Sequence, residues 1–300
     1  MTTEQPVRAA GRLSASEVDD VLALAAAAGE VDGVYPLSED VVLRVRGDVD
    51  HGGRHLLSTG SDGRLAGYAF LPSPDGVGPA GELVVDPLHR RAGHGTALMA
   101  AAGPGPLSFW AHGDDPGAAA FGERNGFTRD RVLWQMRRSL FEPLPDIPLP
   151  EGVTIRGFRP GADEQAWLDV NARAFAHHPE QGGWVLDDLL TRESEPWFDP
   201  AGFLLAVDIA DTVLGFHWTK VHAPEGPDPA LGEIYVLAVD PAGHRRGLGA
   251  ALSVAGLRHL ARAGLTVANL YVDESNPAAV ALYHRLGFTI HKTDVNYRRP

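Results

Sequence analysis

The sequence contains no cysteine in its 300 residues. This absence excludes disulfides, thiolate metal sites and a cysteine nucleophile. Positive charge is also scarce, because 26 lysines and arginines stand against 39 acidic residues, which gives a net charge of −13. A protein whose main partner is a nucleic acid or an anionic membrane presents a basic surface to it. Neither partner is therefore expected for this acidic chain.

Long apolar runs are missing as well. No stretch approaches the roughly 18 apolar residues of a membrane span, and the N-terminus lacks the apolar segment of a signal peptide. We therefore expect a cytoplasmic protein, acting as a monomer on a small molecule. No metal site is expected, because the adjacent His177 and His178 cannot both face one metal in the usual helical way.

An internal repeat organises the chain. Residues 83–98 match residues 237–252 without a gap, and residues 115–127 match residues 276–288, both ending in Gly-Phe. Two matches in the same order and at nearly the same spacing indicate a duplicated fold. With 44% hydrophobic residues and this length, two globular domains are predicted.

A proline-rich stretch separates the two repeats. Residues 141–152 contain four prolines, which are incompatible with helix and sheet interiors, so a semi-rigid linker is predicted there. The predicted domains are residues 1–140 and 153–300. Each combines helices with strands that begin as an antiparallel run, which predicts an α/β fold with a mixed (α+β) sheet.

The individual elements follow from pattern and capping residues. In the first repeat, Ser14 with Glu17 and Ser38 predict two helix starts. Strands are expected at residues 55–58, 65–71, 82–85, 107–111 and 132–137, and a helix at residues 116–124. In the second repeat, strands are expected at residues 153–159, 203–207, 213–220, 233–239, 267–272 and 290–297, and helices at residues 163–175, 186–193 and 276–285.

The most informative stretch is a glycine-rich turn between a buried strand and a helix. It reads His244-Arg245-Arg246-Gly247-Leu248-Gly249. Such a turn leaves backbone N–H groups at the positive end of a helix dipole, where they bind a phosphate. It is neither a Walker loop nor a complete dinucleotide fingerprint. Taken alone, the stretch is equally compatible with an ordinary glycine turn.

In its context, this turn resembles the pyrophosphate loop of the GCN5-related N-acetyltransferases, which bind acetyl-CoA there. His244 stands where that family prefers Gln or Arg, in a loop that works mostly through its backbone. The resemblance implies two tandem domains of this fold, in which neighbouring strands splay apart beside the loop. The oxyanion donor would then be a backbone N–H within residues 237–239.

Acyl transfer from a thioester to an amine needs a base for the ammonium, donors for the oxyanion and an acid for the thiolate. Glu233 begins the strand that leads into the loop and is the candidate base, although a solvated carboxylate is the plain alternative. In the first repeat the aligned residue is Pro79. The nearby Glu82 aligns with Val236. Because Glu82 lies three residues after Pro79, it is predicted to lie on the opposite face of a regular strand from Pro79.

Tyr283 is the candidate acid, because the GCN5-related family has a tyrosine here near the thioester sulfur. The first repeat has Gly122 at this place. Packing in the core is the alternative for Tyr283, and a simple N-cap is the alternative for Asn276, which matches a coenzyme-contacting asparagine. We therefore expect catalysis in the second domain, whereas the first binds coenzyme or supports its neighbour.

A narrower resemblance covers nearly the whole chain. The tandem arrangement and residues 31–34, 109–113, 178–184, 197–200 and 215–221 resemble the mycothiol synthase family. That family acetylates the cysteinyl amine of a cysteine–glucosamine–inositol pseudodisaccharide, desacetylmycothiol. The resemblance implies acceptor contacts at Glu39, Glu180, Lys220, Glu233 and Tyr271. A surface lysine and a buried structural tyrosine are the plain alternatives for Lys220 and Tyr271.

The resemblance also implies coenzyme contacts in both repeats. In the first they fall at Leu83, Val84, Val85, Arg90, Arg91, Ala92, Gly93, His94 and Gly95. In the second they fall at Leu237, Ala238, Val239, His244, Arg245, Arg246, Gly247, Leu248, Gly249, Ala250, Asn276, Pro277, Ala278, Ala279, Val280 and Ala281. Two other functions stay open: acetylation of another amine, such as an aminoglycoside or a peptide N-terminus, and acyl-CoA sensing without catalysis.

Overall fold

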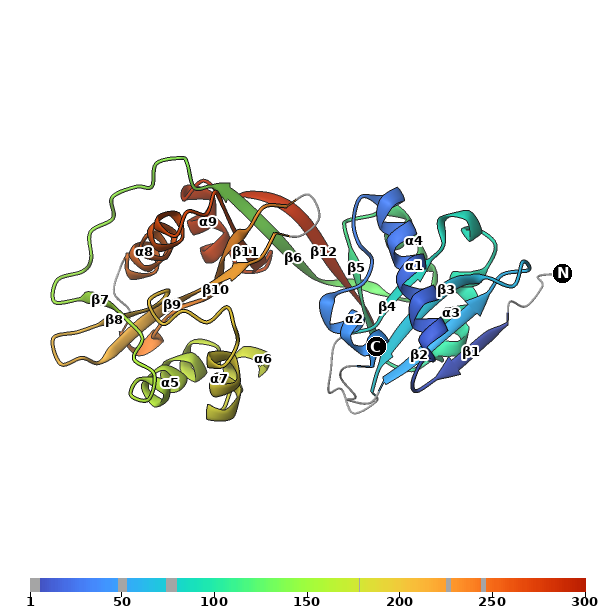
Figure 1. The fold of residues 1–300 in the computed structure, drawn as a ribbon, viewed down its shortest axis with the longest axis horizontal. Helices are drawn as coiled ribbons and strands as arrows, with labels where there is room; N and C mark the ends of the chain where they lie inside the picture. The colour runs from blue at the N-terminus through green and yellow to red at the C-terminus, as the bar shows by residue number, and fades with distance from the viewer. Residues whose placement is uncertain (1–5, 48–52, 74–79, 178, 225–227, 244–246) are drawn as a thin grey trace. The chain divides into compact units, whose positions relative to one another are not determined.

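The computed structural model describes residues 6–47, 53–73, 80–177, 179–224, 228–243 and 247–300 (Figure 1). The chain divides into two compact units. Unit 1 comprises Met1–Leu133, Asp273–Ser275 and Lys292–Pro300, and unit 2 comprises Trp134–Val272 and Asn276–His291. Each unit has its own hydrophobic core.

The unit boundaries differ from the predicted domains 1–140 and 153–300. The last strand, β12 (Thr289–Arg299), pairs antiparallel with β5 (Leu107–His112), so the end of the chain belongs to unit 1. Strand β6 (Thr128–Ser139) begins in unit 1 and ends in unit 2. Pairing between strands far apart in sequence decides which unit a segment joins, and a local pattern does not reveal that pairing.

Residues 141–152 form neither helix nor strand, as their prolines predict. They are not an interdomain linker, however, because they lie within unit 2, between β6 and β7 (Thr154–Gly157). Leu144 and Ile147 pack against the core cluster that contains Leu257 and Phe288. The apolar residues between the prolines therefore anchor this segment to unit 2.

Unit 1 contains a sheet of strand order β1-β2-β3-β4 in which all neighbours are antiparallel. One face packs on α1 and α2 through a cluster that includes Val21, Val41 and Tyr68. A second cluster joins Leu98 of α3 and Phe121 of α4 to the sheet. Besides β5, β6 and β12, the elements are β1 (Val7–Ala10), α1 (Ala15–Asp32), α2 (Glu39–Arg46), β2 (Gly53–Thr59), β3 (Leu65–Pro72), β4 (Glu82–Val85), η1 (Pro87–His89), α3 (His94–Ala102) and α4 (Pro116–Arg124).

Unit 2 has the strand order β11-β10-β9-β8-β7. Strands β10 and β11 are parallel and the other neighbours are antiparallel. Besides β7, the elements are α5 (Glu164–Ala174), α6 (Pro179–Gly182), α7 (Leu186–Glu193), β8 (Phe203–Val207), β9 (Val213–His222), β10 (Leu231–Val239), η2 (Pro241–Gly243), α8 (Leu248–Arg262), β11 (Val267–Asp273) and α9 (Pro277–Arg285). The mixed α/β fold predicted from the sequence is confirmed, with β1 and α6 as additions.

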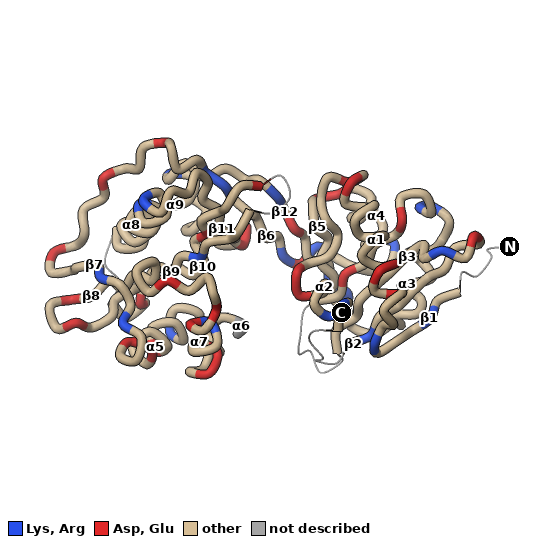
Figure 2. Tube along the Cα trace, viewed as in Figure 1, with Lys and Arg blue, Asp and Glu red and all other residues tan. Residues whose placement is uncertain are grey.

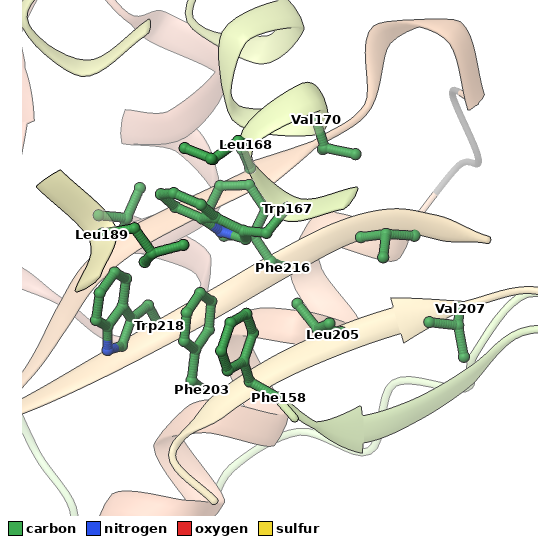
Figure 3. Close-up of a cluster of buried hydrophobic side chains, with 13 residues drawn as sticks. Phe158, Trp167, Leu168, Val170, Leu189, Phe203, Leu205, Val207, Phe216 and Trp218 are labelled. Carbon is green, nitrogen blue, oxygen red and sulfur yellow. The ribbon is translucent and has the colours of Figure 1, made fainter. Parts of the chain in front are cut away.

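An aromatic core lies on the α5 and α7 face of this sheet (Figure 3). The rings of Phe203 and Trp218 stack with their centroids 4.2 Å apart, and Trp167 of α5 contacts both rings edge-on. Helices α8 and α9 pack on the other side of β10, through the cluster that contains Ile234 and Tyr283 (Figure 1). The two faces of β10 therefore meet different layers of helices.

The predicted helix caps of unit 1 are confirmed. Ser14 and Glu17 form a reciprocal capping box at the start of α1, and Gly33 ends that helix with a left-handed backbone. Ser38 caps α2 by accepting a hydrogen bond from the N–H of Val41 at 3.4 Å. These contacts fix where α2 begins.

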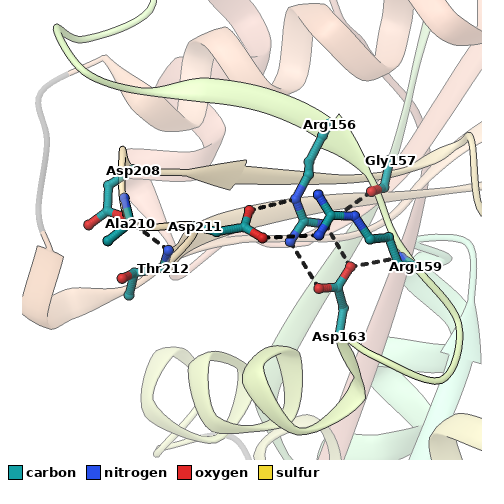
Figure 4. A network of polar contacts seen from close by, with 8 residues as sticks. All are labelled: Arg156, Gly157, Arg159, Asp163, Asp208, Ala210, Asp211 and Thr212. Carbon is teal, nitrogen blue, oxygen red and sulfur yellow. Dashed lines mark hydrogen bonds and ion pairs between the residues drawn. The ribbon is translucent and has the colours of Figure 1, made fainter.

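A charged network ties the first strand of unit 2 to its neighbours (Figure 4). Arg156 of β7 donates to both carboxylate oxygens of Asp163 at 2.6 and 2.9 Å, and to Asp211 at 2.8 Å. These bonds, the one to Asp163 foremost, raise the pKa of Arg156. The bidentate geometry joins the start of α5 to the turn between β8 and β9.

Acidic and basic residues are distributed over both units (Figure 2). No helix in the described part of the chain has the length and apolarity that a membrane crossing requires.

Candidate active site

Helices α3 and α8 both begin behind a glycine. Gly93 and Gly247, which match each other in the repeat, have left-handed backbones with φ of 97° and 86°. Neither helix has a side-chain cap, so its first N–H groups are available to an anion. A residue with a Cβ would be strained at either glycine. His244, Arg245 and Arg246 lie outside the described residues.

The sheet of unit 2 opens just before this turn. The parallel ladder of β10 and β11 ends at Ile234 and Leu270, although both strands continue. On its other edge, β10 stays paired with β9 to its end, and the N–H of Asp240 donates to a β9 carbonyl. Because N–H groups alternate along a strand, those of Leu237 and Val239 point toward the opening.

Unit 1 has the same kind of opening. Strands β4 and β5 meet only at an isolated parallel bridge between Gly81 and Phe109. The N–H of Gly81 donates to Ser108, and the N–H of Trp110 donates back to Gly81. Beyond this bridge β4 pairs with β3 alone among the described strands.

Several predicted coenzyme side chains of unit 1 are engaged elsewhere. Arg90 forms a bidentate ion pair with Asp32 of α1 at 2.8 and 2.6 Å, and this bond raises the pKa of Arg90. His94 is buried and lies 2.8 Å from the hydroxyl of Ser58. Only the backbone of His94 is therefore available to a phosphate at this helix start.

Helix α9 carries two further predicted residues. Asn276 caps the helix by accepting a hydrogen bond from the N–H of Ala279 at 3.1 Å. Tyr283 is buried in a core cluster and contacts Phe288 edge-on. Burial raises the pKa of Tyr283 to about 12, so its phenol remains a proton donor at neutral pH.

Glu233 of β10 is buried, with 7% of its surface exposed. Its Oε2 lies 2.5 Å from Nε2 of His222, which is located at the end of β9. Lys220 lies directly opposite Glu233 in the antiparallel pair, and Asn269 lies opposite it in β11. The structure therefore brings Glu233 and Lys220 together on one face of the sheet, one residue before the ladder opens.

A β-bulge in β10 places Glu233 and Val236 on the same face of the sheet. Glu233 pairs with Lys220 and Val236 pairs with Trp218, with the irregularity between Ile234 and Val236. Lys220 and Trp218 are two residues apart on a regular strand, so Glu233 and Val236 share a face. In the first repeat Pro79, which aligns with Glu233, lies outside the described residues, so the predicted face of Glu82 relative to Pro79 stays a prediction.

Lys220 lies against aromatic rings. Its Nζ is 4.8 Å from the ring centroid of Trp197 and 5.4 Å from that of Tyr235. The hydroxyl of Tyr235 accepts a hydrogen bond from Arg192 of α7 at 3.2 Å. These cation–π contacts hold the ammonium over the two rings, and Lys220 forms no ion pair with another described residue.

The remaining predicted acceptor residues lie in different places. Tyr271 of β11 is 48% exposed, which excludes the buried structural role, and its hydroxyl accepts from Gln135 at 3.0 Å. Glu39 lies exposed in the first turn of α2 in unit 1. Glu180 is part of α6, and its side chain lies outside the described residues.

Glu82 has its own closed network in unit 1. Its carboxylate accepts from the N–H of Ser38 at 2.8 Å and contacts Nε2 of His112 at 3.1 Å. The other nitrogen of His112 lies 3.3 Å from Asp294. Burial alone would lower the pKa of His112, but hydrogen bonds to Asp294 and Glu82 outweigh it and raise the pKa to about 9.

This network predicts that unit 1 weakens in alkali. Because the folded state holds the His112 proton more tightly than the unfolded chain, the stabilisation is complete below pH 6.5 and is lost toward pH 9. We expect a loss of about 3 kcal/mol of unfolding free energy. Urea unfolding of wild type and His112→Gln between pH 6 and 9.5 checks this, and parallel pH slopes would contradict it.

Sequence reasoning missed both histidine contacts. His222 lies two residues beyond the predicted strand 213–220, whereas the observed β9 extends to His222, so a longer strand would have put both side chains on one face. Its pairing with Glu233 depends on the strand register, which spacing does not give.

Comparison with known proteins bears directly on this site. The family model of the GNAT acetyltransferases matches residues 165–288, which hold Glu233, Gly247 and Tyr283. A mycothiol acetyltransferase of Salinispora arenicola is 56% identical over 96% of this chain and 95% of its own length. The chain belongs to the mycothiol acetyltransferase family. It is an acetyl-transferring enzyme.

Solved structures agree with this family membership. A GCN5-related N-acetyltransferase from Sphaerobacter thermophilus has a TM-score of 0.72 and 26% identity, covering 98% of this chain and 96% of its own. A tandem GNAT protein from the clavulanic acid biosynthesis pathway has a TM-score of 0.66 at 20% identity, covering 98% of both chains. The tandem fold predicted for this family member is therefore confirmed.

Proposed function

We propose that this chain transfers the acetyl group of acetyl-CoA to the cysteinyl amine of desacetylmycothiol, giving mycothiol and CoA. The observation that carries the proposal is the buried Glu233 carboxylate beside the opened β10–β11 ladder, in a chain 56% identical to a mycothiol acetyltransferase. Coenzyme would bind through the backbone of the Gly247 turn and the free edge of β10. The catalytic unit would be unit 2.

Glu233 would take a proton from the acceptor ammonium, directly or through one water. The free amine would then attack the thioester carbonyl, and the N–H groups of Leu237 and Val239 would stabilise the oxyanion. Collapse of the tetrahedral intermediate would release the CoA thiolate, which takes the phenol proton of Tyr283, and the second proton lost by the amine nitrogen would restore that phenol. The sequence has no cysteine to carry the acetyl group, so transfer is direct.

Lys220 and Tyr271 would bind the acceptor. Both lie on the same face of the sheet as Glu233. Lys220 of β9 pairs directly with Glu233. Asn269 of β11 also pairs with Glu233, and Tyr271 follows it by two residues on the same face. A polyhydroxylated acceptor offers several hydroxyl groups to such an ammonium and phenol. These contacts support a sugar-bearing acceptor over a purely apolar amine.

Thiol release from acetyl-CoA with a set of amines tests the substrate. We expect rapid release with the cysteinyl-glucosaminyl-inositol acceptor and slow release with an aminoglycoside or a peptide N-terminus. Faster turnover of either other amine would reassign the substrate. Coenzyme binding without turnover of any amine would instead favour an acyl-CoA sensor.

A matched pair of glycine variants tests which loop serves catalysis. Gly247→Ala forces a side chain into a left-handed backbone, at a cost of about 1–2 kcal/mol, so KM for acetyl-CoA should rise about 5- to 30-fold. Gly93→Ala carries the same strain in unit 1 and should leave that KM unchanged. Equal effects on KM would contradict catalysis in unit 2.

A further inference from the structure

The Glu233 carboxylate has one hydrogen-bond partner among the described residues, and that partner is His222. The contact joins Nε2 of His222 to Oε2 of Glu233 at 2.5 Å. The His222 side chain is 37% exposed, whereas that of Glu233 is 9% exposed. The imidazole therefore lies between a buried carboxylate and solvent.

Strand register fixes this contact. Glu233 lies opposite Lys220, and His222 lies two residues farther along β9, opposite Leu231. Glu233 and His222 are thus diagonal neighbours on one face of an antiparallel pair, a distance that long side chains span. Both backbones are held in the ladder, so the imidazole approaches the carboxylate from a fixed direction.

The other cation nearby does not take this role. The Lys220 ammonium lies over the rings of Trp197 and Tyr235 and forms no ion pair with Glu233 in the described part of the chain. Oε2 therefore depends on His222 for its hydrogen bond, and an unpaired buried carboxylate oxygen would be costly. The proposed mechanism assigns no role to His222.

We propose that His222 is a positioning residue for Glu233, an inference that rests on the proposed function. Its Nε2–H donates to Oε2 and fixes the plane of the carboxylate, which leaves Oε1 directed to the acceptor. In the reaction Glu233 gains one proton on Oε1 from the ammonium, and the His222 proton stays on Nε2. The bond that forms is O–H, the bond that breaks is N–H, and the imidazole ends unchanged.

Two substitutions separate positioning from proton transfer. Glutamine at position 222 keeps an N–H donor within reach of Oε2 but cannot accept a proton. Alanine can neither donate a hydrogen bond nor accept a proton. For His222→Ala we expect kcat to fall about 10- to 100-fold, the scale of a misplacement near 1 Å, with KM for acetyl-CoA unchanged. For His222→Gln we expect recovery to within about threefold of wild-type kcat.

Steady-state kinetics of both variants with the cysteinyl-glucosaminyl-inositol acceptor, beside wild type and Glu233→Gln, carries the test. Circular dichroism and melting curves check folding, which is expected because His222 is partly exposed. Wild-type kcat in His222→Ala would overturn the proposal. Equal loss in His222→Gln and His222→Ala would also overturn it, because His222 would then accept the proton itself. Full activity in Glu233→Gln would instead refute the proposed base.

Discussion

Glu233→Gln is expected to lower kcat by about 10²- to 10⁴-fold, because it removes the base that we propose deprotonates the acceptor. The glutamine side chain has the same size and can still contact His222, so the fold should be retained. The proposed acetyl-CoA site, at the Gly247 turn and the β10 edge, is not altered, so KM for acetyl-CoA should change little. Initial rates of thiol release at saturating acceptor measure the effect.

Glu82→Gln is the matched control. The two carboxylates occupy comparable faces of β4 and β10, and each contacts a histidine. Glu82 is 1% exposed and already bonded to Ser38 and His112, so its replacement should lower the stability of unit 1 while kcat stays near wild type. A larger kcat loss in Glu82→Gln than in Glu233→Gln would move catalysis to unit 1.

Gly256→Ala should strongly destabilise unit 2. A Cβ at Gly256 would lie 2.1 Å from Cε1 of His217, which is much shorter than a van der Waals contact. His217 cannot yield, because it is fully buried and its Nδ1 lies 2.8 Å from the carbonyl of Leu252. Burial also lowers the pKa of His217 to about 4, so the ring is neutral at pH 7.

We expect a loss of about 3 kcal/mol or more in the unfolding free energy of Gly256→Ala, the upper range of overpacking. Urea denaturation monitored by tryptophan fluorescence measures it. Gly249→Ala in the same helix is the control, because its Cβ would approach only Val239, at 3.7 Å. In the double variant with His217→Ala, the Gly256→Ala penalty should shrink. An undiminished penalty would show that the clash with His217 is not its cause.

Local chemistry in the sequence predicted much of the fold. The capping residues Ser14 and Ser38 and the two turn glycines Gly93 and Gly247 stand where the structure has helix starts. The repeat predicted two similar units. It did not predict that β12 returns to pair with β5, because no local pattern reports a partner strand more than a hundred residues away.

The sequence likewise predicted some residues of the site but not the contacts that depend on strand register. Glu233, Lys220 and the turn followed from spacing and resemblance, and the structure places Glu233 and Lys220 opposite each other. The bulge after Ile234 was not predicted, and it puts Glu233 and Val236 on one face because a single extra residue shifts the alternation of a whole strand. The His222 contact depends on the same register.

The most direct test of the central claim is the identity of the product after one turnover. Wild-type protein would be mixed with stoichiometric acetyl-labelled CoA and the cysteinyl-glucosaminyl-inositol acceptor, and the product would be analysed by mass and by thiol reactivity. Direct transfer to the cysteinyl amine should give one acetyl group on the cysteinyl nitrogen, a free thiol in the product and no acetylated protein. A product acetylated elsewhere, or label retained covalently on the protein, would contradict it.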